Sequence, residues 1–396
     1  MVKPDERGAI LTAERNLKMA RSAHAYVRGS TAKFYEWLES GTAKLPDGPP
    51  IWICGDCHVG NLGPLANPKG RVAVQIRDLD QTVIGNPAHD LIRLGLSLGS
   101  AARGSDLPGV ATARVLEHLI QGYETALGGH FNREGEVALR PASIQSLLDR
   151  AVRRRWRHLA AERLETADPV IPLGKRFWAL SKDERGGLDS LFADPEVHAM
   201  ITGLQSRQDD DAVSLVDAAY WMKGCSSLGR LRYAAMVRVG KGDGKSYCLL
   251  DIKEAVTAAA PRAPDAQMPR DNAVRVVTGA KALSPHLGKR MVATRLLDKA
   301  VVVRELMPQD LKLEVEALTE RKATALAAYL GGVVGEAHGR QMEDVDRAGW
   351  LKTLRAARPS TLDAPNWLWS SVVELLGIHE AAYLEHCRRF AMARAG

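Results

Sequence analysis

Most of the strand patterns in this chain lie between residues 213 and 306, and this grouping limits the folds that the chain can adopt. Three segments within 213–255 have the alternating or apolar character of strands and are separated by glycine-rich turns, and two more lie within 290–306. A helical pattern at 271–283 separates the two groups, and most of the remaining chain is helical in pattern. A small antiparallel sheet with one helix, placed between helical regions, indicates an α+β fold with two lobes.

The order of these patterns predicts how the chain is divided. We expect residues 1–210 to form a helical lobe that carries a functional hairpin, and residues 211–310 to form a small β-rich lobe. Residues 311–396 should supply helices that complete the helical lobe, beginning with a long helical stretch at 312–340. With 396 residues, the chain is long enough for a separate hydrophobic core in each lobe.

Composition argues against several classes of protein. No run approaches the roughly 20 apolar residues that a membrane span needs, and the first residues lack the apolar core of a secretory signal, so we expect a cytoplasmic protein. The net charge of +7 suits a phosphate-bearing ligand, whereas an aromatic content of 5% argues against the stacking surface of a nucleic-acid binder. Five cysteines, an odd number, indicate reduced thiols rather than a disulfide framework.

Polar side chains gather around a predicted β-hairpin at 61–78. The loop CGDCHVGN follows an apolar strand and places Asp56 five residues before Asn61. Asp78 ends the second strand of the hairpin, and Asp80 follows two residues later. Because the two ends of a hairpin lie side by side, we expect these side chains to converge. Their oxygens suit Mg²⁺, which usually takes one or two protein carboxylates together with substrate phosphates.

This loop resembles the catalytic loop of kinases, in which an Asp accepts the substrate proton and an Asn five residues later holds metal. It is similar to the HGDxHxGN motif of aminoglycoside phosphotransferases, with Cys54 in place of the first His, and the segment DLDQTVIGNPAHDL at 78–91 looks like the block that follows in that family. The resemblance implies that Asp56 is the catalytic residue and that Asp90 is structural. It also implies a set of Mg²⁺ ligands, which are Asn61, Asp78 and Asp80.

A nucleotide clamp is expected after the catalytic loop in this chain. Residues 223–229 form a turn between strands, where small residues let backbone N–H groups approach phosphate oxygens. Lys253 lies on the second strand after this turn, as does the kinase lysine that pairs with nucleotide phosphates. The segment AVVVRELMP at 300–308 then resembles a strand that leads into the hinge beside adenine. The implied ATP-binding residues are Gly224, Ser226, Ser227, Gly229, Lys253, Glu305, Leu306 and Met307.

The kinase blocks therefore appear in a permuted order. The segment YLGGVVGEAHGR at 329–340 resembles the helix that directly precedes the catalytic loop in small-molecule kinases, yet here it follows that loop in the chain. We therefore expect a protein-kinase-like fold that is circularly permuted. Such a permutation keeps the contacts of the fold when the original termini are close in space.

Motifs across nearly the whole chain also resemble the bacterial family called domain of unknown function 2252. The matching segments are 18–29, 55–63, 77–81, 224–229 and 252–255. The chain departs from the family pattern at Leu62, Arg77, Gln81 and Cys225, and the changes at Arg77 and Gln81 bear on metal binding. The family name implies no particular substrate.

Some of the same residues fit other chemistry. Cys54, Cys57 and His58 match the C-x-x-C-H pattern of c-type haem attachment, and they also suit zinc, but the sequence offers no evident further ligand for either. Cys57 beside His58 is a candidate nucleophile, while His58 is either a base or a residue that holds the loop backbone. Arg28 binds either phosphate or a core carboxylate such as Asp90.

Together these patterns predict an ATP- and Mg²⁺-dependent phosphotransferase that acts on a small polar molecule or on a protein. Two alternatives stay open, namely a nucleotide-binding regulator of the pseudokinase type and an enzyme that transfers AMP on the same fold. No carboxylate partner for Lys253 is evident, because the helix at 271–283 has no Glu and Glu254 is expected on the opposite face of the strand.

Overall fold

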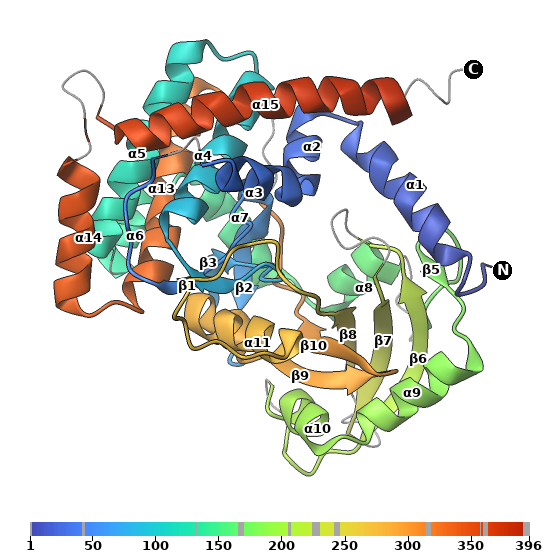
Figure 1. Cartoon of the computed structure of the whole chain (residues 1–396). Coiled ribbons are helices and arrows are strands. Elements are labelled where there is room, and N and C mark those ends of the chain that lie inside the picture. Colours follow the sequence, from blue (N-terminus) through green and yellow to red (C-terminus); the bar gives the residue numbers. More distant parts are fainter. Residues whose placement is uncertain are drawn as a thin grey trace.

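The fold of this chain combines a large helical part with one six-stranded sheet (Figure 1). The computed structural model describes residues 2–41, 44–131, 133–164, 170–204, 207–223, 230–240, 246–313, 318–356, 358 and 363–390. The mixture of helix and sheet agrees with the expected α+β class.

The first forty residues form three helices, α1 (Arg7–Met19), α2 (Ala23–Gly29) and α3 (Thr31–Glu39). Ser22 separates the first two, because its side chain accepts a hydrogen bond from the N–H of Ala25 and so begins a new helix. A two-stranded sheet follows, in which β1 (Ile51–Ile53) pairs with β4 (Val83–Gly85). The predicted hairpin between them is formed by β2 (Leu62–Ala66) and β3 (Val72–Ile76).

Helices make up most of the chain outside the sheets. Between β4 and the short strand β5 lie α4 (Ala88–Arg103), α5 (Gly109–Leu127), α6 (Arg133–Leu139), α7 (Ala142–Arg153) and α8 (Trp156–Leu164), and between β5 and β6 lie α9 (Lys182–Phe192) and α10 (Pro195–Thr202). The last three helices are α13 (Glu320–Gly339), α14 (Asp344–Ala356) and α15 (Asn366–Phe390). A short 3-10 helix, η1 (Val59–Asn61), leads into β2.

The helices α5 and α13 approach each other so closely that glycine is required at the contact. A Cβ atom on Gly122 would lie 1.9 Å from the carbonyl oxygen of Ala328, and one on Gly331 would lie 2.1 Å from that of Leu119. This close packing anchors α13 at the centre of the helical core.

The expected helical stretch at 312–340 is wrong at residues 312–313 and 318–319, which are not helical, while residues 314–317 lie outside the described ranges. Helix α13 begins only at Glu320, where the side chain of Thr319 accepts a hydrogen bond from the N–H of Lys322. Leu311 and Leu313 are buried in non-helical backbone and pack into the main core instead. The apolar character of this stretch thus reflects burial rather than helix.

The six-stranded sheet has the order β5-β6-β7-β8-β10-β9, and all of its strand pairs are antiparallel. Its strands are β5 (Phe177–Trp178), β6 (Val213–Trp221), β7 (Arg232–Val239), β8 (Ser246–Glu254), β9 (Met291–Leu296) and β10 (Lys299–Leu306). The helices α11 (Asn272–Leu283) and α12 (Pro285–Gly288) connect β8 to β9. The three strands and the helix predicted within 213–283, and the two strands after them, are all present.

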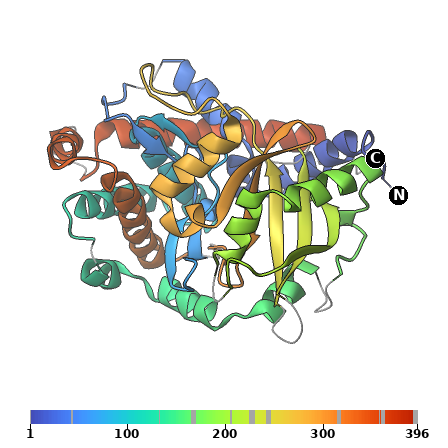
Figure 2. The ribbon, with the colours of Figure 1, turned by 90° about the horizontal axis from the view of Figure 1, so that it is seen from below.

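Side chains alternate between two faces along these strands, as strand geometry requires. On β8, Cys248, Leu250 and Ile252 belong to a core that is shared with α9 and α10, which lie across this face (Figure 2). The opposite face carries Asp251 and Lys253 and looks toward the helical part of the molecule. The sheet therefore offers one apolar face to its covering helices and one charged face to a cleft.

The N-terminal and C-terminal helices pack together at one side of the molecule. The long helix α15 crosses the top of the view in Figure 1 and reaches α1 at its far end. His386 contacts the carbonyl oxygen of Asn16 at 2.8 Å, and the hydroxyl of Tyr383 donates to that of Ala20. Within the described ranges, no helix has both the length and the apolar character needed to cross a membrane.

Candidate functional site

A cleft of about 480 Å³ lies between the charged face of the sheet and the hairpin that the sequence singled out. The hairpin side contributes His58, Asn61, Asp78 and Asp80. The sheet side contributes residues of β7, β8 and β10, and α1 and α2 add side chains at the rim. Residues from opposite parts of the sequence therefore line a single cavity.

Lys253 faces the two aspartates across this cleft. Its ammonium nitrogen is in direct contact with a carboxylate oxygen of Asp80 and lies 3.6 Å from one of Asp78. Burial acts to raise the pKa of Asp78, but the positive charges of Lys253 and Arg232 outweigh it and hold that pKa well below its usual range. Burial and the charge of Asp78 raise the pKa of Asp80. The two carboxylates thus share one cation.

A second charge cluster continues along the same face of the sheet. Asp251 precedes Lys253 by two residues, so the strand period places both on the cleft side. Arg232 lies opposite Lys253 in the register of β7 and β8 and binds both carboxylate oxygens of Asp251, at 2.8 and 2.6 Å. The ammonium of Lys223 lies 3.7 Å from Asp251 and 3.8 Å from the ring centre of Trp221.

Asp56 lies in a smaller recess that adjoins the cleft and shares Asn61, Asp78 and Asp80 with it. The Nε of the buried Arg93 donates to its carboxylate at 2.8 Å, and the amide of Asn61 donates to its backbone carbonyl at 3.0 Å. Burial raises the pKa of Asp56, and the charge of Arg93 acts in the opposite direction. The carboxylate of Asp56 is therefore held in one orientation, in the recess that it lines together with Asp78 and Asp80.

His58 and Arg28 complete the wall beside this recess. The Nε2 atom of His58 lies 3.9 Å from an oxygen of Asp56, and burial together with the charge of Arg28 lowers the pKa of His58 well below 6.5, which keeps the ring neutral. A Cβ atom on Gly60 would lie 2.6 Å from the guanidinium carbon of Arg28, so glycine lets this guanidinium rest against the loop. Arg28 therefore lines the cleft.

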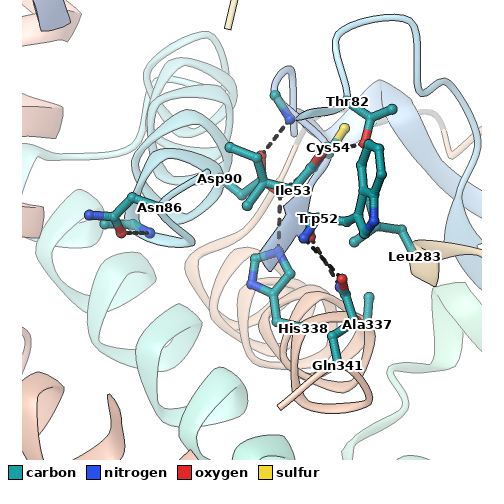
Figure 3. A network of polar contacts seen from close by, with 12 residues as sticks. Trp52, Ile53, Cys54, Thr82, Asn86, Asp90, Leu283, Ala337, His338 and Gln341 are labelled. Carbon is teal, nitrogen blue, oxygen red and sulfur yellow. Dashed lines mark hydrogen bonds and ion pairs between the residues drawn. The ribbon is translucent and has the colours of Figure 1, made fainter. Parts of the chain in front are cut away.

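Asp90 supports the loop from behind (Figure 3). It lies in the first turn of α4, is fully buried, and accepts hydrogen bonds from the backbone N–H groups of Cys54 and Gly55 at 2.7 and 2.9 Å. His338 of α13 lies 3.2 Å from the same carboxylate. The structural role implied for Asp90 agrees with these contacts.

Hydrogen bonds also join Gln341, two residues after the end of α13, to the strand β1, which precedes the loop. The side chain of Gln341 accepts from the N–H of Trp52 at 2.9 Å and donates to its carbonyl oxygen at 3.0 Å (Figure 3). Helix α13 therefore ends beside β1, although Trp52 and Gln341 are 289 positions apart in the sequence.

Residues 7–389 match the family described as "Uncharacterized protein conserved in bacteria (DUF2252)". The chain belongs to this family. The resemblance inferred from the sequence motifs is thereby confirmed over nearly the full length. Searches of curated proteins and of solved structures found no match.

In this DUF2252 chain, the three residues expected at a nucleotide hinge have different surroundings. Leu306 and Met307 line the cleft. The side chain of Glu305 is instead buried and paired with Arg207 at 2.6 and 2.9 Å, and its carbonyl oxygen accepts from Arg290 at 2.8 Å. Glu305 thus contributes to the structure behind the cleft. The predicted glycine turn with Gly224, Ser226, Ser227 and Gly229 lies outside the described residues.

The three predicted metal ligands meet the chemical requirements of Mg²⁺. Asn61, Asp78 and Asp80 line the cleft, and their side chains carry the oxygen atoms that Mg²⁺ prefers as ligands. The two carboxylates already hold the ammonium of Lys253. No group of three or more His, Cys, Asp or Glu side chains suited to a metal occurs in the part of the chain that the structure describes. If Mg²⁺ binds here, substrate phosphate oxygens and water would complete its ligand set.

The cysteine alternatives find no support in the local chemistry. Cys54 and Cys57 are buried free thiols. A hydrogen bond with Cys57, and burial, raise the pKa of Cys54. The hydrogen bond acts to lower the pKa of Cys57, but burial and nearby acids raise it above its usual value. Neither thiol is therefore an activated nucleophile.

Several residues that hold the walls of the cleft in place were not predicted from the sequence of this DUF2252 chain. Helix α11 carries Arg275 rather than a carboxylate toward the site, and its guanidinium donates to the backbone carbonyls of Asp80, Thr82 and Val256. Arg93 lies in the mostly apolar helix α4, and nothing in its local sequence indicates that it contacts Asp56. Asp251 could have been found from the sequence, because it precedes Lys253 by two residues on a predicted strand and so must lie on the same face of the sheet.

Proposed function

We propose that this DUF2252 protein is an ATP- and Mg²⁺-dependent phosphotransferase with a kinase-like fold whose two halves are permuted in sequence. One observation carries the proposal, namely the contact of Lys253 with Asp80 and its approach to Asp78 within a single cleft. Kinases require such a strand lysine opposite a metal-binding aspartate, because phosphoryl transfer depends on positioning and charge neutralisation.

The residues divide into roles that follow from their surroundings. Asn61, Asp78 and Asp80 would hold Mg²⁺, which supplies charge neutralisation for the nucleotide phosphates. Lys253 would bind a phosphate oxygen of the nucleotide. Asp56 orients the acceptor hydroxyl and accepts its proton, and its raised pKa suits that role. Arg93 fixes the carboxylate of Asp56 toward the recess.

Chain order supports the permutation. The strand with Lys253, the helix α11 and the strands β9 and β10 follow one another, and α13 comes next. In a chain with the usual kinase order, the catalytic loop would follow α13 directly. The paired hydrogen bonds between Gln341 and Trp52 put the end of α13 beside the strand that enters this loop, as the permutation requires.

The acceptor is proposed to be a small polar molecule, by analogy with aminoglycoside phosphotransferases. The recess beside Asp56 has a volume of only about 30 Å³, enough for a hydroxyl group but not for a large side chain. A larger acceptor would have to place its body in the main cleft or in solvent.

A thermal-shift titration with ATP, with Mg²⁺ and with both tests nucleotide binding. We expect a rise in Tm that requires ATP and Mg²⁺ together. A metabolite screen then follows the nucleotide products, where ADP indicates phosphoryl transfer and pyrophosphate indicates AMP transfer. Binding without any product would assign a pseudokinase role, and absence of binding would contradict the proposal.

A further inference from the structure

Positive charge around the cleft exceeds what the proposed transfer uses. Among the described residues that line it, ten are lysines or arginines and four are aspartates. Lys253 is matched by Asp78 and Asp80. The remaining cations lie on or beside the sheet, on α8, at the end of the hairpin, in the segment before α13 and at the rim.

Arg77 is the most unusual of these cations. It directly precedes Asp78, lines the cleft, and is only 8% exposed. Within the described ranges its guanidinium makes no hydrogen bond or ion pair, and its Nε atom is buried without a partner. Burial and the charge of Arg304 lower the pKa of Arg77 to about 10, so the group is still charged at neutral pH. A buried cation of this kind is costly unless an anion accompanies it.

Two further guanidinium groups stand beside it. Arg304 of β10 donates to the backbone carbonyl of Arg77 at 3.0 Å, which directs its side chain to the same end of the cleft. Arg163 of α8 lines that end as well, and its charge contributes to lowering the pKa of Arg77. The Nε atoms of Arg163 and Arg304 are buried without a partner in the described structure.

The nearby carboxylates are already occupied. Asp251 is held by both nitrogens of the Arg232 fork. Both carboxylate oxygens of Asp310 accept hydrogen bonds from one nitrogen, Nη2, of the fully buried Arg290, at 3.0 and 3.1 Å. Arg163 has a partner of its own, because its guanidinium lies 3.0 Å from a carboxylate oxygen of Glu162. In the described part of the chain no carboxylate forms an ion pair with Arg77 or Arg304, and both line the cavity.

We propose that Arg77, Arg163 and Arg304 form an anion subsite that binds a phosphate group of the ligand. Guanidinium groups match the geometry of phosphate oxygens and form charge-assisted hydrogen bonds with them. This subsite is separate from the carboxylate pair at Asp78 and Asp80, which binds cations. A ligand that fills the whole cleft therefore carries a phosphate at this end.

Calorimetric titration with inorganic phosphate, without nucleotide or metal, tests the subsite in the full-length protein. Wild type should bind phosphate saturably, and Arg77→Met should weaken binding by about tenfold or more, since it removes one charge-assisted contact. The matched control is Arg295→Gln, which removes an exposed arginine outside the cleft and should leave the phosphate affinity unchanged.

Thermal unfolding separates this account from a purely structural role. In phosphate-free buffer, Arg77→Met should unfold at the same temperature as wild type or higher, because the repulsion among the three arginines falls. Added phosphate should raise the Tm of wild type and leave that of the variant unchanged. A lower Tm with undiminished phosphate stabilisation would overturn the subsite, as would failure of wild type to bind phosphate.

Repeating the phosphate titration at saturating ATP identifies the source of the phosphate group. Competition between the two assigns the subsite to the nucleotide, and simultaneous binding assigns it to a phosphorylated acceptor. Failure of ATP to bind would contradict the proposed transferase, whereas phosphate binding at Arg77 would be measured without it.

Discussion

The ammonium nitrogen of Lys253 lies 3.6 Å from a carboxylate oxygen of Asp78, although one residue is on a strand of the large sheet and the other follows a hairpin of the helical part. The same ammonium contacts Asp80 directly. This arrangement joins the two parts of the molecule at their shared cleft and is the basis of the proposed phosphoryl transfer.

Replacing Asp78 by Asn should abolish nucleotide turnover. The substitution keeps the shape of the side chain but removes the charge needed to hold Mg²⁺, so we expect a rate loss of about 100-fold or more. Release of ADP measures this. Asp346→Asn, at an exposed position on α14, is the control and should retain the wild-type rate. Equal rates in the two variants would remove Asp78 from the metal site.

Replacing Lys253 by Met should strengthen the binding of a bare divalent cation. The ammonium now occupies the space between the two carboxylates, so its removal leaves them free for Mn²⁺, and we expect the Kd to fall by about tenfold. Electron paramagnetic resonance of Mn²⁺ in the absence of nucleotide gives this Kd. An unchanged or weaker Kd would show that Lys253 does not compete with metal at this position.

Replacing Asp90 by Ala should destabilise the protein strongly. The change leaves the N–H groups of Cys54 and Gly55 buried without an acceptor, and we expect a loss of about 3 kcal/mol or more in the free energy of unfolding. Urea unfolding measures it, and Asp90→Asn, which retains one acceptor oxygen, should lose less. Similar losses for both variants would contradict a role based on accepting these two bonds.

Stability should fall as the pH drops below about 6.5. Burial lowers the pKa values of His24, His89 and His379 to about 4, so the unfolded chain binds these protons before the folded protein does. The stabilisation is complete above pH 6.5 and is lost toward pH 4, at up to about 1.4 kcal/mol per pH unit for each histidine. Urea unfolding at pH 7 and pH 5 should show a smaller difference for His379→Leu than for wild type. An identical difference would argue against proton-linked destabilisation at His379.

Features with a short repeat or a fixed spacing could be predicted from the sequence. The period-two pattern located the strands around Lys253, and the Asp56–Asn61 spacing with the following hairpin located the acidic residues of the cleft. The three-residue strand β4 was not predicted, because so short a segment carries no periodicity and forms only by pairing with β1.

Contacts between distant segments could not be predicted from local patterns. Arg93 lies in an apolar helix, and only the fold shows that it reaches Asp56. Arg290 likewise links Asp310 to the carbonyl of Glu305, which removes that group from the expected hinge. Both arginines are buried in the assembled core, and their partners depend on how the helices and sheet come together.

Isothermal titration with ATP, in the presence and absence of Mg²⁺, tests the central claim most directly when wild type is compared with Asp78→Asn and Lys253→Met. The account predicts that wild type binds ATP only weakly without Mg²⁺ and tightly with it, and that each substitution weakens the Mg²⁺-dependent binding by about tenfold or more. Binding that needs no metal and is unaffected by either substitution would contradict it, as would the absence of binding to wild type.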